Sequence, residues 1–113
     1  MSSSINNEIG FHEASLAEAR HLPDGTFCMS FKEVHLRHQL CEATIYLHGV
    51  DRILRDGLPL EVFAMEQEDA EVLTLEIRPG CLSVIIEWND FQRHLQTTAS
   101  YSFFCSSVTI ETR

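Results

Sequence analysis

The chain has 113 residues, a formal net charge of −9 and an apolar content of 44%, which together predict one globular domain with a single core. Seventeen acidic residues against eight basic ones argue against a nucleic-acid-binding surface and against docking on an anionic membrane. No apolar run is long enough to cross a bilayer.

The first part of the chain contains two competing signals. Residues 1–10 are expected to fray, because nothing in them indicates a tethered element. Residues 11–22 have a helix-forming composition, but a Pro-Asp-Gly turn at 23–25 follows at once and a strand pattern comes after it. We favour a strand in a hairpin for residues 11–22, with a helix as the alternative.

Apolar residues hold odd positions from Phe27 to Phe31 and even positions from Val34 onward. A strand over this segment would keep one apolar face only if a bulge near Lys32 and Glu33 restored the alternation. The sequence therefore predicts a single bulged strand.

Residues 41–48 alternate between apolar and polar side chains, which predicts a half-buried strand. The following segment, up to residue 65, has a weaker pattern. Asp56-Gly57 is a turn signal, and Pro59 restricts its neighbours to an edge or irregular strand.

Residues 72–88 give the clearest pattern, a β-hairpin with alternating apolar residues in both arms. Pro79 presets the first central position of its turn, and Gly80 accepts a positive φ at the second. Trp88 shares the apolar parity of the second arm, so we expect it in the core rather than at an interface.

Residues 101–110 also change parity, and we interpret them as one strand with a bulge at Ser106-Ser107. With the other segments this makes about seven strands. The predicted fold is all-β: a single domain over residues 11–113, built as an antiparallel β-sandwich or a partly closed barrel.

Four cysteines stand far apart in the sequence and form no C-x-x-C pair; they are Cys28, Cys41, Cys81 and Cys105. The N-terminus lacks the basic start and apolar stretch of a secretory signal. We therefore expect a cytoplasmic protein with reduced, buried thiols, and two disulfides as the alternative.

Four short motifs carry a family resemblance: residues 11–16 (Phe-His-Glu-Ala-Ser-Leu), 31–34 (Phe-Lys-Glu-Val), 48–50 (His-Gly-Val) and 101–108 (Tyr-Ser-Phe-Phe-Cys-Ser-Ser-Val). They resemble a diffuse group of small bacterial β-rich proteins that open on a Phe-His-Asp-like tripeptide, although Glu13 stands where Asp is commoner. Some members of that group are classed as immunity proteins of polymorphic toxin systems. The resemblance implies a β-rich fold and no catalytic residues.

His35, His38 and Cys41 are candidate zinc ligands by residue type. The first two would share a face on a helix, but residues three apart on a strand point to opposite faces. We therefore predict no metal site and no cofactor. The serines and glycines also lack the context of a nucleophile elbow or a phosphate-binding loop.

His12 and Glu13 could form an acid–base pair only if both side chains reached one atom. Neighbours on a strand face opposite ways, so we expect His12 to be buried or half-buried and bonded to the backbone. A binding protein is accordingly favoured over an enzyme.

An acidic segment spans residues 61–76 without a basic residue. Its carboxylates would attract a basic protein partner, and we assign partner binding to Glu66, Glu68, Asp69 and Glu71. A merely solvated loop is the alternative for this segment. The function predicted is a protein-interaction module, such as an immunity-type inhibitor of a basic toxin. The alternatives are a small-molecule-binding β-barrel and a homo-oligomer held by an open sheet edge.

Overall fold

The computed structural model describes residues 9–113, which are all-β and contain no helix. The all-β prediction is confirmed, with ten strands in place of about seven. Three strands were missed because the strands at residues 9–10 and 58–59 are too short to show alternation, and because the strand predicted over residues 101–110 is in fact two. The strands are β1 (Ile9–Gly10), β2 (Ser15–His21), β3 (Phe27–Leu36), β4 (Gln39–His48), β5 (Arg52–Arg55), β6 (Leu58–Pro59), β7 (Asp69–Arg78), β8 (Cys81–Asp90), β9 (Leu95–Phe104) and β10 (Ser107–Thr112).

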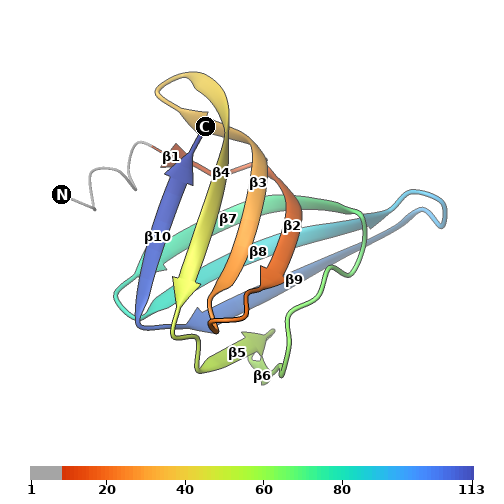
Figure 1. Cartoon of the computed structure of the whole chain (residues 1–113). Helices are drawn as coiled ribbons and strands as arrows, with labels where there is room; N and C mark the ends of the chain where they lie inside the picture. The colour runs from red at the N-terminus through yellow and green to blue at the C-terminus, as the bar shows by residue number, and fades with distance from the viewer. Residues whose placement is uncertain (1–8) are drawn as a thin grey trace.

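All ten strands belong to one antiparallel sheet with the order β10-β4-β3-β2-β7-β8-β9-β5-β6, and β1 pairs beside β3. The sheet curves so strongly that β10, β4, β3 and β2 lie across β7, β8 and β9 (Figure 1). It is not closed, since β10 and β6 are its two ends. The observed single, open sheet therefore matches the predicted sandwich or partly closed barrel only in part.

The turn from one layer to the other lies between β2 and β7, which share a single register pair, Ser15 with Glu71. Two backbone bonds of 2.7 Å extend this link, from Glu13 N to Val72 O and from Val72 N to Ala14 O. This narrow link allows the two layers to face each other and enclose one apolar core.

The core is built from the inward side of each strand. Its largest fully buried side chains are Trp88, Tyr101, Phe27, Phe31, Phe103, Leu16, Met29, Ile45, Leu47, Leu82, Ile86 and Val34. The predicted bulge in β3 is confirmed, because its register with β4 shifts between Phe31 and Val34. Glu33 takes a positive φ of 59° there, and both flanking apolar runs face the core.

Residues 15–21 form strand β2, so the hairpin with β3 is confirmed and the helix alternative is wrong. At the connecting turn the Asp24 carboxylate accepts a bond from Thr26 N (2.9 Å), and Gly25 takes a φ of 88°. Pairing with β3 thus overrides the helix propensity of this segment.

The predicted β7–β8 hairpin is also confirmed, with Gly80 at a φ of 80° in its turn. Trp88 is 1% exposed and lies in the core, as expected. A bulge at Leu73 shifts the register of β7, so Ala70 and Val72 are its fully buried residues.

The prediction of one bulged strand over residues 101–110 is wrong. β9 ends at Phe104 and β10 begins at Ser107, and between them the chain turns a corner and passes from β5 and β8 to β4. Ser106 fixes the corner, because both its backbone N and its hydroxyl donate to the carbonyl of His48 (2.8 Å each).

The expected fraying of residues 1–10 is contradicted at its end, where Ile9 and Gly10 pair with β3. The remainder of that prediction concerns residues 1–8, which lie outside the described residues. All four cysteines are free thiols; Cys28 and Cys105 are buried, whereas Cys41 and Cys81 are half-buried.

The register of β8 makes a stability prediction. Ile86→Ala should lower the free energy of unfolding by about 2–5 kcal/mol, because Ile86 is fully buried and truncation leaves a cavity. Its neighbour Glu87 faces outward, and Glu87→Ala should change stability by less than about 0.5 kcal/mol. Urea unfolding of both variants measures this, and equal effects would mean that the assigned register is wrong.

Two glycines at positive φ provide a matched pair for a second test. Gly57→Ala meets no atom within 4 Å, so it should cost only the strain of its φ of 83°, about 1 kcal/mol. A Cβ at Gly49 would lie 2.4 Å from the Ser106 hydroxyl oxygen. Gly49→Ala should therefore destabilise by about 1 kcal/mol more in urea unfolding, because the Ser106–His48 bond must break. Equal losses of stability for the two variants would contradict the hydrogen bond from the Ser106 hydroxyl to the His48 carbonyl.

Candidate functional site

The acidic segment 61–76 runs from the loop after β6 into β7. Its carboxylates fall into two groups, because Glu66 packs against the sheet and the next ones line a surface groove. Glu66 turns toward the sheet, where Arg55 donates to both of its oxygens, from Nε (2.7 Å) and from Nη2 (3.0 Å). The Tyr101 hydroxyl donates to the same carboxylate. The Arg55 guanidinium holds the pKa of Glu66 below its ordinary value. Glu66 is therefore engaged by partners within the protein, and the partner binding assigned to it from the sequence stays a prediction.

A polar network extends from Glu66 into the core. Trp88 Nε1 donates to the Tyr101 hydroxyl (3.0 Å), and burial raises the pKa of Tyr101 to about 12. Phe63, in the same loop as Glu66, is 3% exposed and lies with its ring centroid 4.9 Å from that of Tyr101. The loop before β7 is thus held against the core by one aromatic ring and one ion pair.

The next carboxylates along the segment line a groove of about 670 Å³ beside the turn between β8 and β9. We call it the acidic groove; its lining residues are Gln67, Glu68, Asp69, Asn89, Asp90, Phe91 and Gln92. Asn89 Nδ2 donates to Asp69 (2.7 Å) and fixes that carboxylate, whereas Phe91 is 70% exposed. The acidic groove combines three carboxylates with an exposed aromatic ring.

The acidic groove continues onto the outer face of the sheet. Glu71 lies directly opposite Glu87, and Asp69 lies opposite Asn89, on the face away from the core. Like charges in directly opposed positions repel each other. The outer face of the sheet therefore carries Asp69 and Glu71 beside Glu87, and Glu68 and Asp90 lie in the adjoining acidic groove. Glu87 and Asp90 were not among the residues assigned from the sequence.

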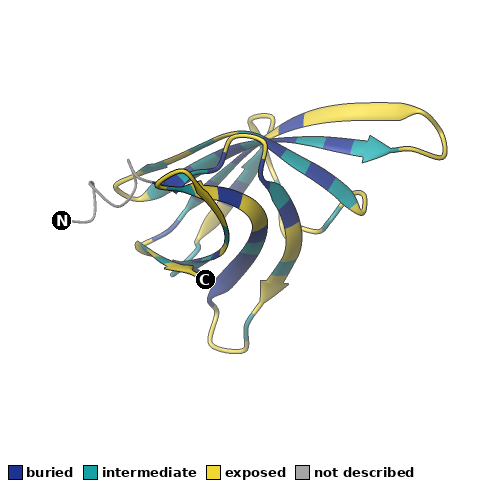
Figure 2. Ribbon diagram, turned by 90° about the horizontal axis from the view of Figure 1, so that it is seen from above, coloured by how far each residue is buried: buried dark blue, intermediate teal, exposed yellow. Residues whose placement is uncertain are grey.

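The turn between β8 and β9 projects well beyond the rest of the sheet (Figure 1). The first four residues of β9 are exposed, and Figure 2 shows this end of the hairpin standing clear of the other strands. We call residues 90–98 the β8–β9 tip. It carries Phe91, Leu95 (56% exposed) and Asp90.

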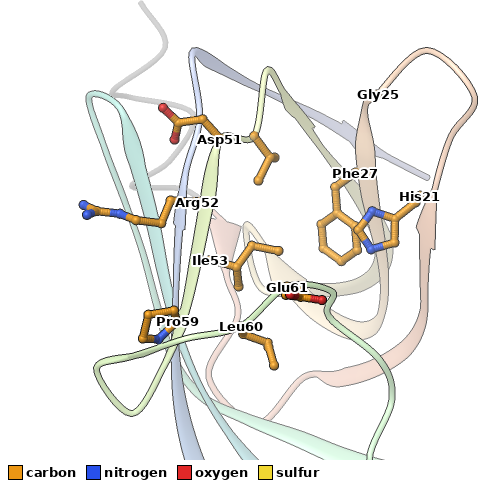
Figure 3. A pocket seen from close by; sticks show the side chains of 10 residues that line it. His21, Gly25, Phe27, Asp51, Arg52, Ile53, Pro59, Leu60 and Glu61 are labelled. Carbon is orange, nitrogen blue, oxygen red and sulfur yellow. The ribbon is translucent and has the colours of Figure 1, made fainter.

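A second concavity of about 350 Å³ lies where the loop between β6 and β7 begins, among residues of β2, β3, β5 and β6 (Figure 3). Phe27 and Ile53 form its apolar floor, and the His21 ring packs 4.7 Å from the Phe27 ring. Arg52 points away from it and stacks over Phe104 at 4.3 Å. The lining of the pocket is thus mixed, with His21 and Glu61 as the polar groups turned toward it in Figure 3.

The three residues that are candidate zinc ligands by type lie on different parts of the β3–β4 hairpin. Cys41 pairs with Val34, a core residue, whereas His35 belongs to the exposed face and His38 to the turn. Within residues 9–113 no three His, Cys, Asp or Glu side chains are grouped so as to hold a metal ion.

The expectation for His12 and Glu13 is corrected, because residues 11–14 form a turn instead of a strand. His12 does bond to the backbone, donating from Nδ1 to the carbonyl of Leu73 (2.7 Å), but its side chain is 72% exposed. Its Nε2 lies 3.7 Å from the Glu13 carboxylate, so the two side chains meet on the surface.

A comparison of the chain with known protein families, curated proteins and solved structures finds no match. Among the described residues there is also no helix of the length and hydropathy needed to span a membrane.

The Glu66 network makes a prediction about pH. The pKa of Glu66 is lowered in the folded protein, so its stabilisation is present above the unfolded pKa and is lost as the pH falls through the folded pKa. Glu66→Gln should therefore cost about 1–2 kcal/mol at pH 7 and progressively less below about pH 4.5.

Thermal unfolding across this pH range provides the measurement. The matched control is Glu68→Gln, since Glu68 is exposed and has no ion pair or hydrogen bond among the described residues. A loss for Glu66→Gln that stayed constant down to pH 2 would refute the role of the ionised carboxylate.

Proposed function

We propose that the chain is a non-enzymatic protein-interaction module that binds a basic protein partner through the acidic groove and the β8–β9 tip. The observation that carries the proposal is the arrangement of Glu68, Asp69 and Asp90 around an exposed Phe91 on a projecting hairpin. An immunity-type inhibitor of a basic toxin is the form of this function that the resemblance to the Phe-His-Asp group suggests.

Electrostatics favours a basic partner over a neutral one. Clustered carboxylates create a negative potential that accelerates the encounter with a positively charged surface. In addition, Glu71 and Glu87 are register partners, and a Lys or Arg side chain placed between such opposed like charges would offset their repulsion. The partner's charge thus removes an unfavourable interaction while it forms new favourable ones.

Phe91 supplies the apolar component of the proposed interface. Aromatic residues are over-represented at the energetic centres of protein interfaces, and 70% exposure leaves most of this ring available for burial. In the pocket of Figure 3, by contrast, the phenylalanine ring is that of Phe27, which is 1% exposed and already belongs to the core. The acidic groove is therefore the better candidate for the principal site.

The triple variant Glu68→Gln, Asp69→Asn, Glu71→Gln tests the charge component. With a basic partner captured from the native cell, its association rate should fall about three- to tenfold at low salt. The difference should shrink as salt rises, because the screening length falls from about 10 Å at 0.1 M to about 3 Å at 1 M.

The control is a second triple variant with the same change in net charge, Glu18→Gln, Glu42→Gln, Glu111→Gln, whose exposed carboxylates lie on the other layer of the sheet. Stopped-flow or surface-binding kinetics should show a much smaller effect for it. Equal association rates for the wild type and the groove variant at low salt would mean that the acidic segment is only solvated.

A further inference from the structure

The outer edge of β9 is paired along only half of its length. β5 pairs with residues 101–104 of β9, and the backbone of Asp56 extends this contact to Ser100. Residues 95–99 have β8 on one side, and no other described strand pairs with them on the other side. The exposed end of the β8–β9 hairpin therefore has a free sheet edge.

The hydrogen bonds at Ser100 identify which backbone groups this edge offers. Asp56 N donates to the carbonyl of Ser100 (2.7 Å), and Ser100 N donates to the Asp56 side chain (2.9 Å), so both groups of Ser100 point away from β8. Alternate residues of a strand point their backbone groups the same way. The N–H and C=O groups of Thr98 and Gln96 thus point to the free edge.

The surroundings of this edge select the charge of a strand that could pair with it. Gln96 and Thr98 are uncharged and exposed, and on the same face of the sheet Thr98 lies opposite Glu87, which in turn lies opposite Glu71. A strand added beside β9 would place every second side chain on this face. A Lys or Arg side chain there can extend across Thr98 toward the two glutamates, because its stem is long and flexible.

We infer that the free edge of β9 at residues 95–99 binds an extended, basic segment of the partner as an additional antiparallel or parallel strand. This inference rests on the proposed function and adds its mode. Backbone bonds to Gln96 and Thr98 hold the segment, and its alternate basic side chains face Glu87 and Glu71. A second copy of the chain is disfavoured at this edge, because two chains of charge −9 repel each other.

The probe is a fluorescent eight-residue peptide of alternating Lys and Thr, and its binding is measured by anisotropy at low salt. Thr98→Pro removes one edge N–H, whereas the control Thr98→Ala keeps it. We expect Thr98→Pro to weaken binding at least about tenfold and Thr98→Ala to change it less than about threefold. A peptide in which Glu replaces Lys should not bind.

A second measurement leaves the protein unaltered, in case Thr98→Pro disturbs folding. The same Lys-Thr peptide, N-methylated at every second residue in each of the two registers, should bind the wild-type protein at least about tenfold more weakly in one register. Loss of binding in one register and not in the other supports strand pairing, because N-methylation removes backbone donors and leaves the charge of the peptide unchanged.

Three outcomes would overturn the inference. Peptide binding could be unaffected by N-methylation and by Thr98→Pro but lost in the double variant Glu71→Gln, Glu87→Gln. That result would be compatible with the proposed function and would exclude strand addition. The peptide could also fail to bind while the triple variant at Glu68, Asp69 and Glu71 still associates more slowly with a basic partner. That result would likewise exclude strand addition and be compatible with the proposed function. A dimer of the chain itself, detected by sedimentation and dispersed by Thr98→Pro, would assign the edge to a second copy.

Discussion

The Tyr101 hydroxyl is the point at which four separate parts of the chain meet. Tyr101 is 1% exposed, and a phenol that is buried so deeply needs partners for its polar oxygen. Trp88 donates to it from β8, and it donates to Glu66 in the loop before β7. Arg55 of β5 then pairs with Glu66. The position of the loop, and of the acidic groove that follows it, depends on this chain of bonds.

The same network gives two neighbouring carboxylates different surroundings. Glu66 and Glu68 are two residues apart and look equivalent in the acidic segment, but one is in a bidentate ion pair and the other is exposed. The difference comes from Arg55 and Tyr101, which are far from Glu66 in the sequence. Local charge patterns cannot contain such information.

Most of the fold that was predictable depends on local alternation. The bulge in β3 and the β7–β8 turn follow from parity and from the Pro79-Gly80 pair, and both are present. The corner after β9 was missed because it depends on a long-range contact, the close approach of Gly49 to Ser106. A parity change fits a bulge and a corner equally well, and only the neighbouring strand distinguishes them.

The bulge at Leu73 shows how one residue determines the candidate site. With Arg78 opposite Cys81, an unbroken register would place Glu71 opposite Trp88, on the side of the core. The extra residue shifts the pairing, so that Val72 faces inward beside Ile86 and Glu71 faces outward beside Glu87. A one-residue slip exchanges the two faces of a strand, and here it creates the acidic face. Alternation in the sequence could not fix this position, since Leu73 is itself apolar.

The free edge of β9 and the negative charge of the protein depend on each other. The β6 edge of the sheet is protected by Pro59, whereas residues 95–110 contain neither proline nor any charged residue. An edge without such features invites pairing with other copies of the chain. The protection here is distributed over the molecule, because a charge of −9 keeps copies apart at long range. The same charge attracts a basic segment, so the property that suppresses self-association also selects the proposed partner.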